Sequence, residues 1–392
     1  MYFLIINVGL SAVRFMVATM PGRKVELEGE IRGWGLGEDA GSQLTYTHGA
    51  RNVQKQCHCP DIVSACGIIS GLMVELDLHD FDAVVHHVMH GGKRYRAPVV
   101  VDKRVLRHLR SLDAFAPLHN PPALSMVEEM MDMYSHASQV CVFDTGFHAD
   151  MPAYNTMIPL AAEFTQDVQR YGFHGISYEG LVEDATMYLQ KKGLADRRLV
   201  LVHIGNDVSV CATRDGISQN TSMGFSPLSG PIMGRRTGDI DFAALYHIAQ
   251  KEDMDMDEMY ELLNSHGGFE GLTHHSDIRD VKRLADQGSV RCVEALDMFG
   301  MQVARLIVSY GCDLDGIDAI VFSGGAGSHA PWLRSLICGN LGWMGVRMSA
   351  AKNERVMQGM VSTASSRIPV LIFPSREQMV MLEKAYAFLQ AE

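Results

Sequence analysis

The sequence predicts an α/β protein with more than one domain. Apolar, β-rich runs alternate along the chain with segments whose apolar residues recur at helical spacing. Several of these runs end in glycine-rich or polar turns, which is typical of α/β proteins that bind ligands at strand ends. The chain has 392 residues, 47% of them apolar, and is about twice as long as a typical domain. We therefore expect two domains, or one large divided domain, with sizeable cores.

The first part of the chain is predicted to be rich in β-strands. Residues 1–17 indicate a strand, a turn and a strand, and the polar, glycine-rich residues 23–49 suggest further antiparallel strands. The other elements expected here are helices at 61–78, 102–112 and 123–134, strands at 83–89 and 139–143, and an interruption at 116–122. Met130, Met131 and Met133 are expected to fill core gaps rather than to form an adaptable binding surface.

The second part is organised around a strand, a polar turn and a strand at residues 199–213, followed by the hairpin signal Asp215-Gly216. The other expected elements are helices at 177–193, 290–310 and 376–390, two helical stretches between 241 and 263, and strands at 317–322 and 370–374. Two β-rich segments each run into a glycine turn, at 203–207 and at 323–327. This suggests duplicated halves.

The turn at residues 203–207 and the adjacent Arg235 and Arg236 indicate a phosphate-handling site. A polar turn between two strands allows backbone N–H groups and small side chains to approach an anion closely. Glycine turns are common in α/β proteins, however, and an arginine pair can equally be a solvated surface. Both interpretations remain open on these residues alone.

Composition excludes several classes of partner. The formal charge of −12 argues against a nucleic-acid backbone or an anionic membrane surface as the main partner. No apolar run approaches the roughly 20 residues that span a bilayer, and without a secretion signal we expect the cytoplasm. Cys57-His58-Cys59 lacks a second ligand pair at zinc-site spacing. We expect reduced thiols and no structural zinc.

Two long strings carry a resemblance to a known family. Residues 170–177 (RYGFHGIS) and 222–241 (SMGFSPLSGPIMGRRTGDID) resemble the two acetate kinase signatures, and the similarity covers almost the whole chain through INVG, VVHHVMHGG, APLHNP, VFDTGFHADMP, SDIRD, IVFSGGAG and FPSREQ. The resemblance implies two related actin-like (ribonuclease H-like) α/β domains around a central cleft. We expect residues 1–146 with 376–392 as the N-terminal domain and 147–375 as the nucleotide-binding C-terminal domain.

The resemblance also implies an activity, transfer of the γ-phosphoryl group between ATP and a short carboxylate such as acetate, in a homodimer that uses Mg²⁺ or Mn²⁺. The residues that match catalytic positions are Asp144, His174, Arg236 and His119, and His87 and Arg236 match substrate-binding positions. Asn7 and Glu377 match metal-supporting positions. The positions that match nucleotide contacts are Arg14, His203, Gly205, Asn206, Asp207, Asp277, Arg279, Gly325 and Gly327. Taken singly, Asp144 could cap a turn, His119 could lie in a core and Asn7 could form a turn.

Several residues depart from the family pattern. His87 stands where the family has arginine, and a histidine of ordinary pKa is only about one-quarter protonated at pH 7. Asp207 replaces a glycine of the turn at residues 203–207, which corresponds to the second phosphate turn of the family pattern. Other departures are Leu10 and Ala12 for serines, Arg14 for lysine and Ser328 for glutamate. Three hypotheses follow: a carboxylate kinase of weakened or altered specificity, a non-catalytic protein that binds nucleotide or carboxylate, and a kinase for a larger acid.

Overall fold

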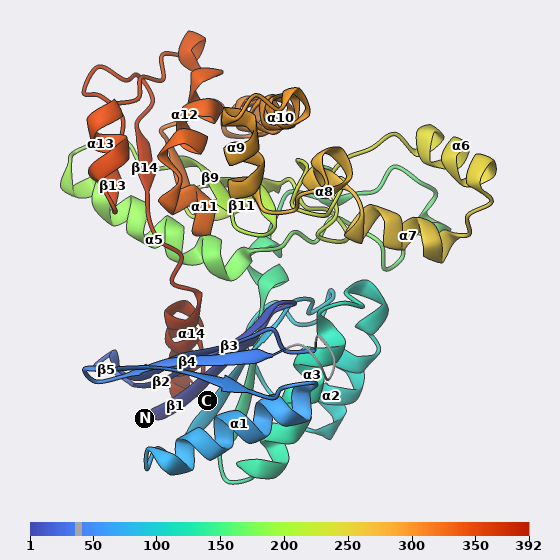
Figure 1. The fold of residues 1–392 in the computed structure, drawn as a ribbon. Coiled ribbons are helices and arrows are strands. Elements are labelled where there is room, and N and C mark those ends of the chain that lie inside the picture. Colours follow the sequence, from blue (N-terminus) through green and yellow to red (C-terminus); the bar gives the residue numbers. More distant parts are fainter. Residues whose placement is uncertain (36–40, 392) are drawn as a thin grey trace. The chain divides into compact units, whose positions relative to one another are not determined.

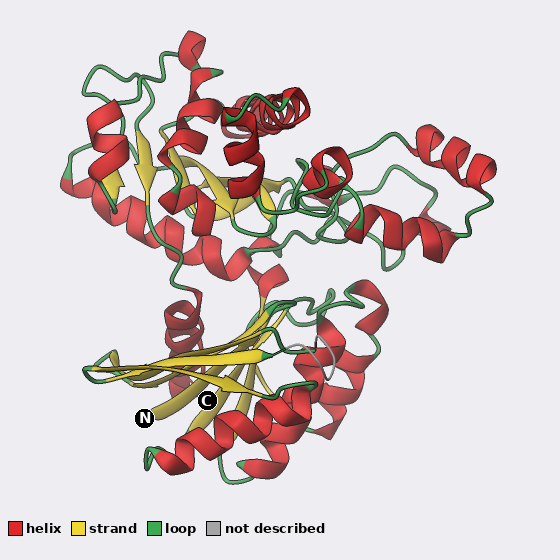
Figure 2. Cartoon of the chain, in the orientation of Figure 1, coloured by secondary structure: helices red, strands yellow, loops and turns green. Residues whose placement is uncertain are grey.

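The computed structural model describes residues 1–35 and 41–391, which form two compact units. The first unit comprises Met1–Gly146 and Arg376–Glu392, and the second comprises Phe147–Ser375. Helices and strands are mixed in both units (Figure 2). Residues 36–40, part of the expected antiparallel region 23–49, lie outside the described residues.

The first unit contains a mixed sheet with the strand order β5-β4-β3-β2-β1-β6-β8-β7 among its described residues. Consecutive strands from β1 to β5 are antiparallel, whereas β1, β6 and β8 are parallel neighbours. The bounds are β1 (Tyr2–Val8), β2 (Ala12–Thr19), β3 (Lys24–Arg32), β4 (Ser42–His48), β5 (Arg51–Cys57), β6 (Ala83–Val88), β7 (Val99–Val100) and β8 (Ser138–Phe143).

Helices cover both faces of this sheet (Figure 1). Leu4, Ile6 and Val8 of β1 share a core with α1 and α3, whereas the ring of Phe3 contacts Tyr386 of α14. Successive side chains of a strand point to opposite faces, so α14 covers the face opposite α1 and α3. The helices are α1 (Ile62–Glu75), α2 (Lys103–Arg110), α3 (Asn120–Met133) and α14 (Glu377–Ala391), with 3₁₀ turns at Asp113–Phe115 and Asp144–His148.

The start of α3 differs from the sequence expectation. The expected interruption at 116–122 is partly wrong, because Pro121 and Pro122 lie in the first turn of the helix. Proline is tolerated there, since the first helical N–H groups have no partner within the helix. Met130 is fully buried in the core, as expected, whereas Met133 is 41% exposed.

The second unit repeats the arrangement of the first. Its sheet has the order β11-β10-β9-β12-β14-β13 among the described residues. The strands β9 to β11 are antiparallel neighbours, and β9, β12 and β14 are parallel, as β1, β6 and β8 are. The bounds are β9 (Arg198–Ile204), β10 (Val208–Arg214), β11 (Ile217–Thr221), β12 (Ala319–Ser323), β13 (Gly359–Met360) and β14 (Val370–Ile372). This shared topology supports the expected duplicated halves, although the two glycine turns that suggested them, at 203–207 and 323–327, both lie in the second unit.

The helices of the second unit include α5, whose apolar residues share a core with β9, and the long α10, which packs on β10 and α12. The short helices α8, α11, α12 and α13 were not predicted. The bounds are α4 (Ala153–Thr156), α5 (Gly175–Lys191), α6 (Phe242–Glu252), α7 (Met256–Ser265), α8 (Gly268–Thr273), α9 (Ile278–Asp286), α10 (Val290–Leu314), α11 (Gly325–His329), α12 (Pro331–Gly339) and α13 (Ala350–Arg355), with 3₁₀ turns at Ala162–Phe164 and Gly342–Met344.

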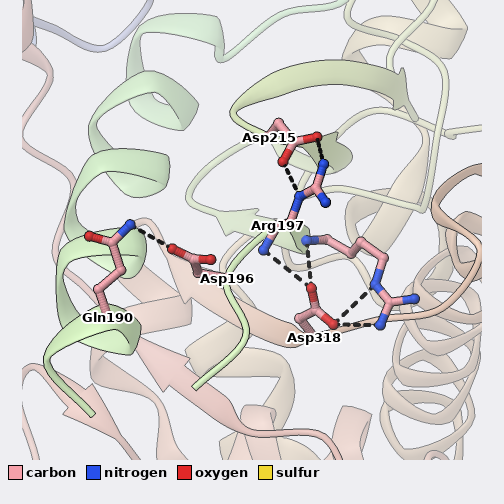
Figure 3. A network of polar contacts seen from close by, with 6 residues as sticks. Gln190, Asp196, Arg197, Asp215 and Asp318 are labelled. Carbon is pink, nitrogen blue, oxygen red and sulfur yellow. Dashed lines mark hydrogen bonds and ion pairs between the residues drawn. The ribbon is translucent and has the colours of Figure 1, made fainter. Parts of the chain in front are cut away.

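A polar network joins the amino ends of β9 and β12 (Figure 3). Both backbone N–H groups of Arg197 and Arg198 donate to Asp318, and the Arg198 guanidinium donates to the same carboxylate. The Arg197 guanidinium pairs with Asp215. The network aligns the two parallel strands, so their carboxyl ends also lie side by side.

Within the described ranges, no helix combines the length and apolar character needed to cross a membrane. All eight cysteines are free thiols. Among the same residues, no three or more His, Cys, Asp or Glu side chains form a group that could hold a metal, including around Cys57 and Cys59.

Candidate functional site

In the first unit, three predicted site residues lie at the carboxyl ends of the parallel strands. Extending the register Ile6↔His86 by one residue places Asn7 beside His87, and Asp144 directly follows β8. Because side chains alternate across a sheet, Asn7 and His87 point to the face opposite α1 and α3. Nε2 of His87 lies 3.5 Å from Oδ1 of Asp144, and both side chains are nearly buried. The fold therefore gathers these three residues at one edge of the sheet.

Helix α14 covers that face and contributes Glu377, its first residue. The helix packs on β1, β6 and β8 (Figure 1). Burial acts to lower the pKa of His87, but the carboxylates of Asp144 and Glu377 raise it, and the net direction is upward. At pH 7 the imidazole is thus protonated to a larger extent than the one-quarter expected of an ordinary histidine.

The turn His90-Gly91-Gly92 after β6 is held by residues that the sequence analysis did not select. Asn120 accepts from the backbone N–H of His90 and donates to its carbonyl, both at 3.1 Å. The N–H of Gly91 donates to Thr145 at 3.2 Å. Asn120 follows the predicted His119, which is 8% exposed, and Thr145 follows Asp144. Position next to a predicted residue was the only sequence signal for either.

Arg14, a predicted nucleotide-binding residue, lies on β2 opposite Asn7. Its side chain is 55% exposed, and Nε is 3.0 Å from the carboxylate of Glu30. An exposed ion pair of this kind is weak, on the order of 0–1 kcal/mol. Arg14 therefore remains able to exchange Glu30 for another anion.

His86 points to the opposite face of the sheet and supplies a test of pH dependence. Burial lowers its pKa from 6.5 to about 4, against the effect of a hydrogen bond with Gln139. The unfolded chain takes up the proton first as the pH falls, so this contribution to stability is complete above pH 6.5 and is lost between pH 6.5 and 4.

Between pH 6.5 and 4, the free energy of unfolding of the wild-type protein should fall by about 3 kcal/mol more than that of His86→Gln. Urea unfolding at several pH values measures it. His247→Gln, at an exposed position of α6, should keep the wild-type pH dependence. Equal pH dependence in His86→Gln and wild type would show that His86 does not titrate in this way.

In the second unit, two glycine turns lie against one another at the carboxyl ends of β9 and β12. The turn after β9 is closed by the N–H of Gly205, which donates to the Asp207 carbonyl at 2.9 Å. Gly324 has φ +79°, and a Cβ there would lie 2.5 Å from the carbonyl oxygen of Ile204. Only glycine allows this approach. Residues 203–207 and the glycines at the start of α11 therefore share one edge of the sheet.

Two imidazoles stack beside these turns. The rings of His174 and His203 are 4.2 Å apart at an interplanar angle of 22°. Nδ1 of His174 is 2.8 Å from the Ser209 hydroxyl, which also bonds Tyr178, and Nδ1 of His203 is 2.9 Å from the Ser177 hydroxyl. His174 has φ +59° at the start of α5. The hydroxyls fix both rings, and the sequence analysis had selected neither serine.

Arg236 is buried beside the second phosphate turn, whereas its neighbour Arg235 is exposed. Arg236 is 3% exposed, and its Nη1 lies 2.8 Å from Oδ1 of Asp207. Two backbone hydrogen bonds hold the loop of Arg236. The Arg236 carbonyl accepts from the N–H of Met233, and the Arg235 carbonyl accepts from the N–H of Gly267. The two arginines therefore do not form a solvated surface together. Arg236 faces inward and is paired with Asp207, which replaces the glycine of the family pattern.

The same loop meets the start of α9. A Cβ on Gly234 would lie 2.8 Å from the carbonyl oxygen of Ser276 and 3.8 Å from that of Asn206. Asp277 caps α9, and its carboxylate also pairs with Arg279, whose side chain is 84% exposed. The predicted residues of the second unit thus come together from five segments: the turn after β9, the arginine loop, and the starts of α5, α9 and α11.

Comparison with known proteins identifies the family of this chain. The profile described as the acetokinase family matches residues 2–383. The acetate kinase of Thermotoga maritima is 36% identical over 394 residues, with 97% of each chain covered. The chain belongs to the acetokinase family. This confirms the resemblance that residues 170–177 and 222–241 carry.

Solved structures of acetokinases share the fold. A propionate kinase from Francisella tularensis aligns with a TM-score of 0.91 and 26% identity over 98% of each chain. The acetate kinase of Porphyromonas gingivalis aligns with a TM-score of 0.87 and 27% identity over 99% of each chain. The predicted α/β fold of two related actin-like units is confirmed.

Beneath the glycine turn of α11, this acetokinase buries an arginine that the sequence analysis missed. Arg334 is 1% exposed. Its Nη1 donates to the carbonyls of Gly327 and Ser328, both at 2.8 Å, and its Nε and Nη2 donate to Asn353 at 2.8 and 2.7 Å. The guanidinium thus holds the glycine turn at the start of α11. Its partners are mostly backbone carbonyls, so no side-chain pattern pointed to it.

We expect Arg334→Met to lower the free energy of unfolding by about 3 kcal/mol or more, because several buried acceptors each lose a donor worth roughly 1–3 kcal/mol. Urea unfolding provides the measurement. Arg355→Met, an exposed arginine in α13, is the matched control and should remain near the wild-type value. Similar values for the two variants would contradict the assigned role.

Proposed function

We propose that this acetokinase transfers the γ-phosphoryl group between ATP and a short-chain carboxylate such as acetate, with altered or weakened specificity. The observation that carries the proposal is the buried Arg236 beside the second phosphate turn, in a chain of this family. The names of the Thermotoga acetate kinase and the Francisella propionate kinase support a short acid.

The reaction needs alignment and charge neutralisation more than proton transfer. A carboxylate oxygen attacks the γ-phosphorus, the new P–O bond forms, and the bond from phosphorus to the β,γ-bridging oxygen breaks to release ADP. The carboxylate is already ionised, so it requires no general base. In this proposal Arg236 neutralises charge on the moving phosphoryl group and the acid, and His174 donates to phosphoryl oxygens.

The first unit is proposed to hold the acid and orient the reacting groups. His87 would bind the carboxylate, and its contact with Asp144 supports the role of Asp144 in orienting its neighbours. His119 would add a second imidazole beside the turn after β6. We assign this unit as the N-terminal actin-like domain.

The second unit is proposed as the nucleotide-binding domain. His203, Gly205, Asn206 and Asp207 lie in or beside the turn expected to contact the phosphates. The residues expected to contact adenosine are Asp277, Arg279, Gly325 and Gly327, with Arg334 supporting their turn. Arg14 is also proposed to contact the nucleotide.

The residues of the first unit fit a magnesium or manganese ion. Asn7 and Glu377 offer an amide and a carboxylate oxygen on the same face of the sheet, the ligand type these ions prefer. Mg²⁺ is typically held by one or two carboxylates together with substrate phosphates and waters. When bound, the ion would neutralise part of the charge of the phosphates. Asn7 and Glu377 are the residues we propose to hold it.

Acyl hydroxamate formation tests the proposed activity directly. Acetate, propionate and butyrate are each combined with ATP, GTP and pyrophosphate in the presence of Mg²⁺. We expect turnover with at least one pair of substrates. Absence of activity above an Arg236→Ala control with every pair would contradict the proposal.

A second candidate is a non-catalytic protein that binds nucleotide or carboxylate. His87 and the Asp207–Arg236 contact favour it, because each reduces the positive charge available to a phosphoryl group. Calorimetry with nucleotides and carboxylates separates the candidates. Binding without turnover supports the second, and rapid turnover contradicts it.

We also propose a cytoplasmic homodimer, as the family resemblance implies. Helix α6 exposes Phe242 and Tyr246, at 70% and 60%, which suits an interface between copies. Sedimentation should give twice the 43.3 kDa chain mass, and a monomer at micromolar concentration would contradict the dimer. Cell fractionation tests the location.

A further inference from the structure

The contact between Arg236 and Asp207 joins two residues of the second unit that are far apart in the sequence. Nη1 of Arg236 and Oδ1 of Asp207 are 2.8 Å apart. The guanidinium side chain is 4% exposed, and the Asp207 side chain is 27% exposed. The carboxylate is therefore partly exposed to solvent, whereas the cation that it contacts is buried.

The contact neutralises the charge of Arg236 but does not satisfy Nη1 as a hydrogen-bond donor. Although the two atoms are close, Nη1 makes no hydrogen bond of acceptable geometry and is itself buried. A buried donor without a hydrogen bond costs on the order of 1–3 kcal/mol. An anion that aligns with Nη1 would recover this free energy. The Asp207 carboxylate is therefore a displaceable partner of Arg236.

The position of Asp207 explains how it can act. It lies in the turn that residues 205–207 form between β9 and β10, and the other two residues of that turn are Gly205 and Asn206. A glycine at position 207, as the family pattern has, would leave the guanidinium to external anions. In this chain the Asp207 carboxylate contacts the Arg236 guanidinium instead.

We propose that Asp207 sets the affinity of Arg236 for anionic substrates, as an internal carboxylate that occupies Arg236 until an acid or acyl phosphate displaces it. The proposal rests on the proposed function, in which Arg236 binds these anions. It predicts that a substrate must compete with a carboxylate held permanently nearby. The enzyme then requires a higher concentration of its anionic substrate than one with glycine at this position.

Asp207→Asn tests the competition, because asparagine keeps the size but removes the charge. With inorganic phosphate and acetate as separate probes, calorimetry should give a dissociation constant at least about tenfold lower than wild type, equivalent to 1.4 kcal/mol. Asp207→Gly should behave in the same way. In kinetics, KM for the acid should fall in both variants while kcat changes much less.

A stability measurement distinguishes competition from a purely structural role. Removing Asp207 leaves a buried cation without its partner, so the ligand-free variant should unfold at a lower temperature than wild type. Added phosphate should raise the unfolding temperature of Asp207→Asn by more than it raises that of wild type. A purely structural carboxylate would give the loss of stability without this larger response to phosphate.

Two controls complete the experiment. Asp215→Asn removes a carboxylate from the exposed pair with Arg197 in the same unit (Figure 3) and should leave anion affinity unchanged. In the double variant Asp207→Asn/Arg236→Ala, the gain in affinity should disappear. Anion binding that is unchanged or weaker in Asp207→Asn overturns the proposal. Because binding is measured without turnover, an inactive protein whose Asp207→Asn variant gains affinity contradicts only the proposed activity.

Discussion

Phosphoryl transfer should fall about 10³-fold or more when Arg236 is replaced by alanine. In the proposed role the guanidinium, which is buried, would stabilise developing charge in a water-poor site once an anion has displaced Asp207. From a typical turnover of roughly 10 to 10³ per second, the variant should retain about 1 per second or less. The measurement is kcat/KM for acyl phosphate formation with the preferred acid.

The neighbouring residue provides a matched control. Arg235 differs from Arg236 by one position in the chain and is exposed, so Arg235→Ala should remain close to wild type. Arg236→Lys keeps the charge but loses the planar, two-pronged donor, so it should recover only part of the activity. Equal losses in Arg235→Ala and Arg236→Ala would show that burial does not select the catalytic arginine. Circular dichroism should confirm that all three variants are folded.

The second large effect is a gain. His87→Arg should raise kcat/KM for acetate by on the order of 10², less than the 10³ or more that an arginine can contribute at a phosphoryl-transfer site. The gain is smaller because the carboxylates of Asp144 and Glu377 raise the pKa of His87, so the wild-type residue already carries part of a positive charge. Arginine would make the charge permanent and offer two aligned donors.

His79→Arg is the control for this gain, since it makes the same chemical change at a half-exposed position of the first unit. It should leave kcat/KM unchanged. If His87→Arg leaves acetate turnover unchanged while propionate or butyrate is preferred by wild type, His87 instead accommodates a larger acid. If no acid responds to His87→Arg, His87 is not a substrate-binding residue.

Local elements could be predicted from the sequence where short-range patterns suffice. The strand, turn and strand at 199–213 became β9 and β10, and the helix expected at 290–310 became α10, because their apolar periodicity concerns neighbouring residues. The start of α3 was predicted wrongly, since Pro121 and Pro122 were read as an interruption. Proline disrupts a helix interior but not its first turn, and only the structure shows which position it occupies.

The long signature strings identified the family and predicted Arg236 and His174 as site residues, because strings of that length are unlikely to match by chance. The partners of these residues were not predictable. Ser209 orients His174, and Asn120 holds the turn at His90, yet each is an ordinary polar residue in its own segment. The buried Arg334 was missed because backbone carbonyls, which every residue carries, are its main acceptors.

The sequence by itself determined the family, the alternation of strands and helices, and the residue types available for phosphoryl transfer. Tertiary structure decided which of them meet. Parallel strands bring their carboxyl ends together whatever the length of chain between them, so Asn7, His87 and Asp144 share one edge. The contact of Asp207 with Arg236 arises in the same way, when a strand turn and a distant loop pack together. Sequence patterns report on residues that are close along the chain, whereas electrostatic interactions depend on which charged groups are close in space.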